Sequence, residues 1–195
     1  MEKKYSWKLN EIIFTAMLCV VFGVIYLGAV WLIAPLSAVF TPMGFANLGT
    51  EIIFGVWFMA ATLAGYIIRR PGAALIAEIL AALIEVLLGN MYGPMVIVTG
   101  FVQGIGAELV FAAGKYQKYD AKTVYLASFA CCVLSFVWSF IRSGYGKFSI
   151  GLIVVYFIVR AISSLLFAGV ISKAMGDGLA KTGLMKGYAI GRTDD

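Results

Sequence analysis

Long apolar runs dominate this chain, separated only by short segments rich in proline, glycine and charged residues. A run of about 20 apolar residues spans the hydrocarbon core of a bilayer as an α-helix. Of the 195 residues, 62% are hydrophobic and 13% are charged, whereas about 25% are charged in a typical soluble domain. We therefore predict an all-α integral membrane protein, a single domain of six transmembrane helices. These cover residues 10–32, with Asn10 as the N-cap, 50–68, 71–88, 94–115, 122–141 and 150–173, and a basic tail follows over 174–195.

Positive charge is concentrated in alternate connections between the predicted helices. Twelve of the fifteen lysines and arginines lie in the two tails and in the connections after the second and fourth helices. Arg142 and Lys147 lie before the sixth helix, and Arg160 lies within it. Because cytoplasmic loops carry the excess of lysine and arginine, we predict that both termini are cytoplasmic. The net charge of +5 then fits a multi-pass protein of the bacterial cytoplasmic membrane and gives no reason to expect nucleic acid.

Signatures of catalysis and of metal binding are missing from the sequence. There is no histidine, and Cys19, Cys131 and Cys132 all lie in apolar runs, where we expect them to pack as small apolar residues. No HExxH motif, aspartate pair or serine–histidine pair favours an intramembrane enzyme. No GxxxxGK[ST] loop is present, so the chain is not expected to hydrolyse ATP itself. We predict a protein that is not an enzyme and has no cofactor or metal.

Acidic, amide and aromatic residues gather near the predicted outer ends of several helices. Aromatic faces attract flat cations, and carboxylates supply charge and hydrogen-bond acceptors. We therefore favour a binding site for an organic cation with flat rings. The alternative is that these aromatic residues lie at the membrane interface and that the acids extend toward water. The predicted site residues are Glu51, Trp57, Glu85, Asn90, Tyr92, Trp138 and Tyr156.

Glu78 lies seven residues before Glu85 on the same face of its helix, which corresponds to about 10 Å of depth. We expect Glu78 to have a structural or coupling role, together with Glu108 and Arg160. Arg160 is predicted to pair with Glu108 or Glu78, because isolated charges are costly inside a membrane. Capping of these acids by hydroxyl groups is an alternative, and a proton relay is a third.

Two further segments of the sequence lead to structural predictions. Ala16, Cys19 and Gly23 form a stripe of small residues on the first helix, which favours close packing against a helix of this chain or of another subunit. Residues 33–49 contain two prolines and are expected to form a broken outer connection, either a short helix that dips into the outer leaflet or a lid.

Residues 67–111, IIRRPGAALIAEILAALIEVLLGNMYGPMVIVTGFVQGIGAELVF, resemble the thiamine-type substrate-capture (S) components of energy-coupling factor (ECF) vitamin transporters, the YkoE family. Looser similarity extends over 51–58, over 143–145 and over the glycine-rich tail. The resemblance implies the six-helix S-component fold and a ligand, thiamine or its hydroxymethylpyrimidine precursor, bound near the outer face. Gln103 and Tyr145 lie in the similar segments and join the predicted binding residues.

The resemblance also implies partner proteins: a transmembrane coupling protein and two cytosolic ATPases that supply the energy. Ala16, Cys19 and Gly23 are the nearest match to the small residues that dock S components on the coupling protein, although Val20 stands where the usual alanine pair has its second member. The main alternative is a proton-coupled secondary transporter of an organic cation that uses Glu78 or Glu108. The sequence does not separate thiamine from its precursor or another vitamin.

Overall fold

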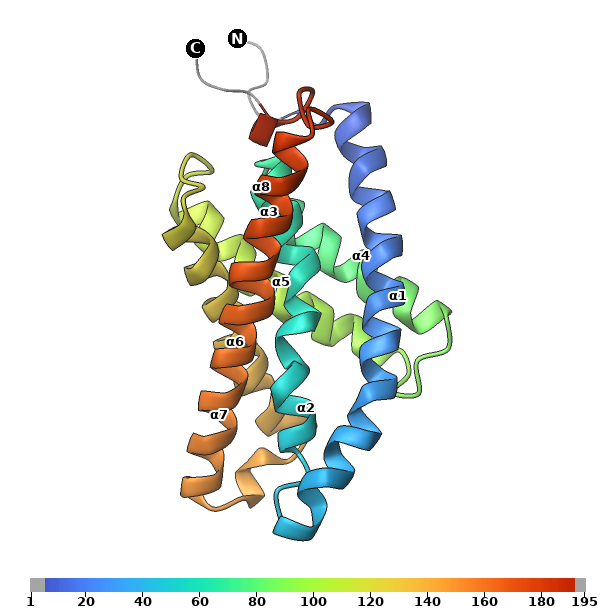
Figure 1. Cartoon of the computed structure of the whole chain (residues 1–195), viewed down its shortest axis with the longest axis vertical. Helices are drawn as coiled ribbons and strands as arrows, with labels where there is room; N and C mark the ends of the chain where they lie inside the picture. Colours follow the sequence, from blue (N-terminus) through green and yellow to red (C-terminus); the bar gives the residue numbers. More distant parts are fainter. Residues whose placement is uncertain (1–5, 192–195) are drawn as a thin grey trace.

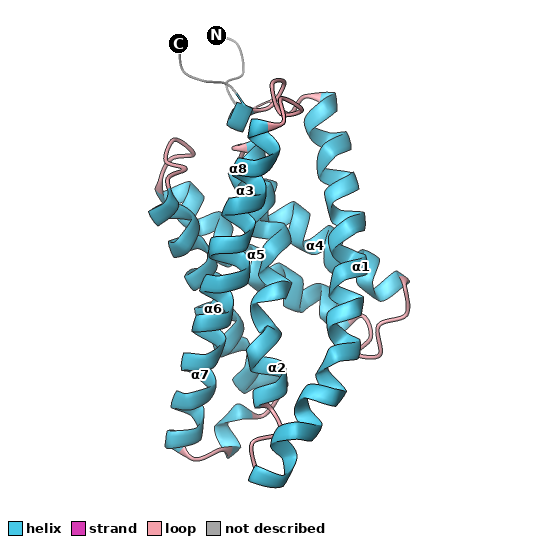
Figure 2. Cartoon of the chain, in the orientation of Figure 1, coloured by secondary structure: helices cyan, strands magenta, loops and turns pink. Residues whose placement is uncertain are grey.

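The computed structural model describes residues 6–191, which fold into helices joined by short connections, without β-strands in that range (Figures 1 and 2). The predicted all-α class is confirmed. Lys3, Lys4 and residues 192–195 of the predicted basic tail lie outside the described residues. The main helices are α1 (Leu9–Phe40), α2 (Leu48–Ile53), α3 (Met59–Ile68), α4 (Ala73–Leu87), α5 (Met95–Ala113), α6 (Ala121–Arg142), α7 (Ile150–Ser164) and α8 (Ser172–Lys181), with short 3-10 or π segments η1 (Thr41–Met43), η2 (Phe54–Phe58), η3 (Tyr145–Lys147), η4 (Leu165–Ile171) and η5 (Ala189–Gly191).

Five continuous helical runs within residues 6–191 are long and apolar enough to cross a membrane. They are Leu9–Met43, Leu48–Ile68, Met95–Ala113, Ala121–Arg142 and Ile150–Lys181. The remaining predicted span corresponds to α4, which has 15 residues and packs between α1, α3 and α5. The start of α1 and the end of the described chain lie at the same end of the molecule (Figure 1), where the Tyr188 hydroxyl donates to the Asn10 carbonyl at 3.2 Å.

The first helix is longer than predicted, because residues 33–40 continue α1 instead of forming a broken connection. Pro35 lies inside the helix with its ring exposed, and α1 bends in its second half (Figure 1). Its extension is packed against α2 at Gly49, where a Cβ atom would lie 2.3 Å from the Ser37 nitrogen. The tertiary contact therefore outweighs the helix-breaking tendency of proline. The N-cap is Lys8 and not the predicted Asn10, since the Glu11 carboxylate accepts from the Lys8 amide.

Two predicted helices contain irregular turns. The predicted span 50–68 consists of α2, the 3-10 segment η2 and α3, and the span 150–173 consists of α7, the π-helical segment η4 and α8. Helix α8 reaches Lys181, so the first part of the predicted tail is helical. At the first interruption, the Gly55 amide donates to the Ser163 hydroxyl at 2.9 Å. A Cβ at Gly55 would lie 2.2 Å from the Ser163 carbonyl oxygen, so glycine permits this contact.

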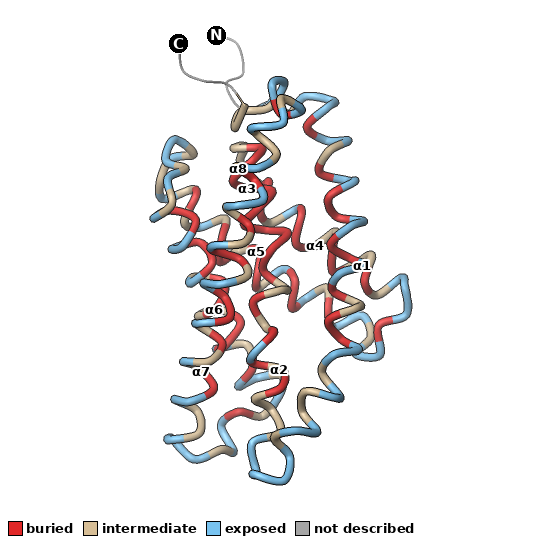
Figure 3. Tube along the Cα trace, in the orientation of Figure 1, coloured by how far each residue is buried: buried red, intermediate tan, exposed pale blue. Residues whose placement is uncertain are grey.

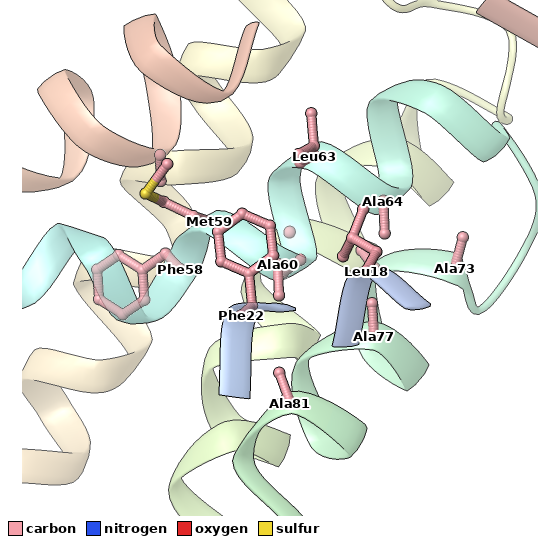
Figure 4. Packing of buried hydrophobic residues seen from close by; sticks show 14 of the residues in the cluster. Leu18, Phe22, Phe58, Met59, Ala60, Leu63, Ala64, Ala73, Ala77 and Ala81 are labelled. Atoms are coloured by element: carbon pink, nitrogen blue, oxygen red, sulfur yellow. The ribbon is translucent and has the colours of Figure 1, made fainter. Parts of the chain in front are cut away.

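Small residues bring α4 close to its neighbours. Figure 4 shows Ala77 and Ala81 of α4 in the buried cluster that also contains Leu18 and Phe22 of α1. On the other side of α4, a Cβ at Gly100 of α5 would lie 2.7 Å from the Ala82 methyl group. Such contacts let membrane helices pack at short distance. Buried residues lie along the sides of the helices that face one another, and the outward faces are exposed (Figure 3).

The small-residue stripe of α1 faces two different surroundings. The Cys19 thiol donates to the Ala77 carbonyl at 3.4 Å, and a Cβ at Gly23 would lie 2.5 Å from Cγ2 of Ile84. Both positions therefore pack against α4 of this chain, which is one of the two alternatives predicted for the stripe, and they are buried in this structure. Ala16 is exposed and remains available for a partner. The three cysteines are buried, as predicted for packing residues.

Candidate ligand-binding site

A cavity of about 390 Å³ lies between α1, α2, α4, α5 and α6. Its lining residues include the ends of α4 and α6 and the beginnings of α2 and α5, which meet around it in the region that we call the distal side. The exposed lining residues Tyr92 and Ser143 mark the mouth of the cavity there. This volume is within the range of small-molecule sites. Polar and aromatic lining residues include Tyr26, Asn47, Thr50, Phe54, Trp57, Glu78, Glu85, Asn90, Tyr92, Thr99, Gln103, Ser135, Trp138, Ser139, Arg142, Ser143 and Tyr145.

Glu78, for which we predicted a structural or coupling role, is buried and lines this cavity together with Glu85. Its Oε2 atom accepts from the Tyr26 hydroxyl at 3.0 Å and from the Ala61 amide at 2.9 Å. Ala61 belongs to the first turn of α3, whose amides have no partner within their own helix. The helix N-terminus also carries partial positive charge. The interruption at η2 thus creates the place where a carboxylate is tolerated in the middle of the bundle.

The other carboxylate of the cavity, Glu85, is held by a different pair of donors. Its Oε1 atom accepts from Trp57 Nε1 at 3.4 Å and from the side-chain amide of Asn90. The Asn90 Oδ1 atom in turn accepts from the Tyr92 amide at 2.6 Å, so the turn after α4 orients the amide. Glu78 Oε1 and Glu85 Oε2 are buried and have no hydrogen-bond partner within the described part of the chain. Each carboxylate therefore keeps one oxygen available for a ligand.

Aromatic side chains form much of the wall. The Trp57 ring lies 6.5 Å from the Tyr26 ring and 5.9 Å from the Phe54 ring, measured between centroids. On α6, Trp138 Nε1 donates to the Thr99 hydroxyl at 3.1 Å, which fixes the orientation of the indole. Flat rings beside buried carboxylates suit a flat cationic ligand.

Glu51 and Arg160 form a buried ion pair instead of facing the cavity. Arg160 Nε lies 2.5 Å from Glu51 Oε2, and Nη2 lies 2.7 Å from Oε1. The prediction that Arg160 pairs with Glu108 or Glu78 is wrong, because Glu51 on α2 directly faces α7 and both groups are fully buried. Arg160 also donates to the Ser139 hydroxyl at 2.9 Å, and its Cζ lies 3.7 Å from the Phe54 ring centroid.

Tyr145 connects this ion pair to the cavity. Its ring lines the cavity, and its hydroxyl donates to Glu51. Burial and the nearby Glu51 charge raise the pKa of Tyr145, so its hydroxyl remains a donor. Tyr156 is buried against Tyr145 and Phe148, with ring centroids at 5.8 and 5.6 Å. It does not reach the cavity surface, so its predicted contact with a ligand does not match its position.

Glu108 lies at the opposite end of α4 from the cavity mouth. Its carboxylate accepts from the amides of Gly72, Ala74 and Leu75 at 2.6, 3.1 and 3.3 Å. It therefore caps the N-terminus of α4. The Tyr116 hydroxyl donates to it at 2.8 Å, and burial together with this bond raises the pKa of Tyr116 to about 12.

The predicted site residues thus separate into two groups. Glu51 and Tyr156 contact Tyr145 but do not line the cavity, and the others line it. Sequence reasoning missed Tyr26, Thr99 and Arg142. Tyr26 is one of the few polar side chains of α1, and its hydroxyl group could have indicated a site, whereas Arg142 was used only to predict the orientation in the membrane. The predicted residues that line the cavity are Trp57, Glu85, Asn90, Tyr92, Gln103, Trp138 and Tyr145.

Comparisons with known proteins agree with this architecture. Residues 10–134 match the family described as "ABC-type cobalt transport system, permease component". The chain is 43% identical over 187 residues to the "Putative HMP/thiamine permease protein YkoE" of Bacillus subtilis (strain 168), covering 96% of this chain and 92% of that protein. A structure described as "Crystal structure of an S-component of ECF transporter" superposes with a TM-score of 0.90 at 42% identity, covering 95% of this chain and 92% of the other.

These relatives and the apolar helices define a multi-pass cell-membrane protein, a component of a transporter and not an enzyme. The chain belongs to the YkoE family of ECF-transporter S components.

Proposed function

We propose that the chain is the high-affinity binding subunit for thiamine, or for its hydroxymethylpyrimidine precursor, in an ATP-driven ECF importer. The observation that carries this proposal is the pair of free carboxylate oxygens, Glu78 Oε1 and Glu85 Oε2, in one aromatic-walled cavity. Glu78 and Glu85 are seven residues apart on one helix, which spaces them by about 10 Å. The two acceptors therefore suit an elongated ligand with donors or positive charge at two places.

Thiamine matches this arrangement through its chemistry. Its aminopyrimidine ring carries hydrogen-bond donors, its thiazolium ring carries a positive charge, and both rings are flat. Trp57 and Trp138 supply ring faces, and the carboxylates supply charge-assisted hydrogen bonds. The printed name of the Bacillus subtilis relative, an HMP/thiamine permease, supports the same ligand class.

Energy coupling is assigned to partner proteins. The sequence contains no nucleotide-binding loop of the GxxxxGK[ST] type. In our proposal a transmembrane coupling protein joins the chain to two cytosolic ATPases, with both termini of the chain cytoplasmic and the distal side facing outward. The exposed apolar face of α1 around Ala16 is the proposed docking surface, and Met17 and Val20 lie on that face.

The ligand is tested by calorimetric titration of the purified full chain with thiamine, hydroxymethylpyrimidine, riboflavin and biotin. Binding of thiamine or its precursor is expected without ATP or partner proteins, because the cavity is already formed. Binding of riboflavin or biotin with no heat from thiamine or its precursor would reject the proposed ligand.

The coupling mechanism is tested separately in proteoliposomes. Uptake is expected only when the coupling protein, the ATPases and ATP are present. Uptake by the chain alone, driven by a proton gradient, would support the secondary-transporter alternative.

A further inference from the structure

The cavity offers opposite hydrogen-bonding groups at its interior and at its mouth. In the interior, Glu78 and Glu85 are about 1% exposed or less, and each presents a free acceptor oxygen. At the mouth, Arg142 is half-buried and Ser143 is exposed, and both line the cavity. The guanidinium and the hydroxyl are hydrogen-bond donors. A ligand that satisfies both ends has donors or positive charge inside and acceptors or negative charge outside.

Arg142 is fixed in place with part of its donor set unused. Its Nη1 atom donates to the Thr99 hydroxyl at 2.8 Å, and its Cζ lies 5.9 Å from the Tyr92 ring centroid. Within residues 6–191, its Nε and Nη2 atoms make no hydrogen bond. Its contacts with Thr99 and Tyr92 hold the planar group in position. A guanidinium edge with two parallel donors binds phosphate or carboxylate oxygens in a bidentate manner.

The charged groups around the cavity favour an anionic group on the outer end of the ligand. Arg142 forms no ion pair with Glu78 or Glu85 in the described part of the chain. One oxygen of Glu85 already accepts from Trp57 and Asn90, and these hydrogen bonds stabilise its charged form without an ion pair to Arg142. The positive charge of Arg142 repels the cationic part of a ligand and attracts an anionic part. The arginine has a use when the outer end of the ligand carries an anionic oxygen group.

We propose that this site accepts the phosphate monoesters of its ligand, with the phosphate bound at Arg142 and the cationic or amine-bearing ring near the carboxylates. The inference rests on the proposed function, since it takes thiamine or hydroxymethylpyrimidine as the parent ligand. It extends that function to a substrate class that carries opposite charges at its two ends.

The test compares the parent ligand with its ester on three forms of the full chain. Thiamine and thiamine monophosphate are titrated calorimetrically into the wild type, Arg142→Gln and Lys147→Gln. Lys147 is exposed on the same distal side, does not line the cavity and gives the matched loss of one positive charge. Arg142→Lys, which retains the charge but loses the planar donor edge, is a second variant.

In the wild type we expect the ester to bind. In Arg142→Gln the ratio of ester affinity to thiamine affinity should fall by about tenfold or more, as expected for loss of a charge-assisted hydrogen bond. The ratio should fall less in Arg142→Lys and stay unchanged in Lys147→Gln. Inorganic phosphate at the same concentrations should not compete with thiamine, because the ring provides the anchoring contacts.

Several results would overturn the inference. These are a wild type that binds thiamine but not its ester, an unchanged ratio in Arg142→Gln, or an equal fall in Lys147→Gln. Retained thiamine binding in Arg142→Gln shows that the variant is folded. Failure of the wild type to bind either thiamine or its ester would instead reject the proposed function, and with it this inference.

Discussion

Glu78 shows how a single residue acquires a role that its position in the sequence conceals. Counting along the helix places it about 10 Å deeper than Glu85, and on that basis we predicted a structural or coupling role for it. The interruption at η2 leaves the first amides of α3 in the middle of the bundle, and Ala60 and Ala61 donate to Tyr26 and Glu78. The cavity extends inward to this point. Both glutamates therefore face the same ligand space.

Replacement of either glutamate should weaken ligand binding. Glu85→Gln and Glu78→Gln each remove a charged acceptor, and loss of a hydrogen bond to a charged group costs about 1.5–3 kcal/mol. Glu78→Gln should also lower the melting temperature, because the neutral amide interacts less well with the α3 amides. Calorimetry and thermal melting in detergent measure both effects.

Glu108→Gln is the matched control for these variants, because Glu108 has the same carboxylate but caps α4 away from the cavity. Its affinity for thiamine should equal that of the wild type. Normal thiamine binding by Glu78→Gln, together with complete loss of thiamine binding by Glu85→Gln, would contradict this expectation. It would instead support the sequence-based prediction that Glu85 binds the ligand and Glu78 has a structural or coupling role.

The melting temperature should fall strongly when one member of the Glu51–Arg160 pair is replaced, and much less when both are replaced by apolar residues. Removing one member of a buried ion pair leaves an uncompensated charge and typically costs about 3–5 kcal/mol, whereas apolar replacement of both can be nearly neutral. Arg160→Met and Glu51→Leu should each lower the melting temperature strongly, and the double variant should recover most of the loss. Additive losses in the double variant would show that the two groups act independently.

At the scale of helices, apolar run length and charge located the elements well, but irregular backbone was not predicted. The runs that became α5 and α6 begin and end within two residues of the prediction, because clear breakers and charges flank them. The continuation of α1 through Pro35 and the interruptions at η2 and η4 were missed. They depend on contacts with other helices, such as Gly49 against Ser37 and Gly55 against Ser163, which local pattern does not contain.

Gly55→Ala should destabilise the protein by disturbing the contact between η2 and α7. The added Cβ would lie 2.2 Å from a backbone carbonyl oxygen, which cannot move aside as a side-chain tip can. Gly28→Ala on α1 is the control, because no atom lies within 4 Å of its Cβ position and alanine favours a helix by about 1 kcal/mol over glycine. Thermal melting should show a lower midpoint for the first variant and an equal or higher one for the second. Equal midpoints for the two would contradict this account of the interruption.

Larger side chains at the exposed and the buried positions of the small-residue stripe on α1 should have different effects on transport and stability. Ala16→Trp should reduce ATP-driven uptake by the complete transporter and leave thiamine affinity and melting unchanged, since Ala16 is exposed. Gly23→Leu should lower the melting temperature, because the side chain would collide with Ile84 of α4. Uptake and melting, measured in parallel, separate the two effects. Full uptake with Ala16→Trp would place the docking surface elsewhere.

For the whole molecule, composition and hydropathy were sufficient to predict an all-α membrane protein, and the quoted motif was sufficient to predict its family. The contacts that shape the site join residues far apart in the chain, such as Tyr26 with Glu78 and Glu51 with Arg160. Several pairings were equally consistent with the charges present, since hydropathy fixes the depth of a residue but not the neighbour it faces. Seven of the nine predicted binding residues line the cavity, because position near the distal side was itself informative.

The most direct test of the central claim is an experimentally determined structure of the chain with thiamine bound. The account predicts that the ligand lies in the cavity between Trp57 and Trp138, with donor or cationic atoms of the ligand in contact with the free oxygens of Glu78 and Glu85. Thiamine bound outside this cavity, or bound within it without contact to either carboxylate, would contradict the account.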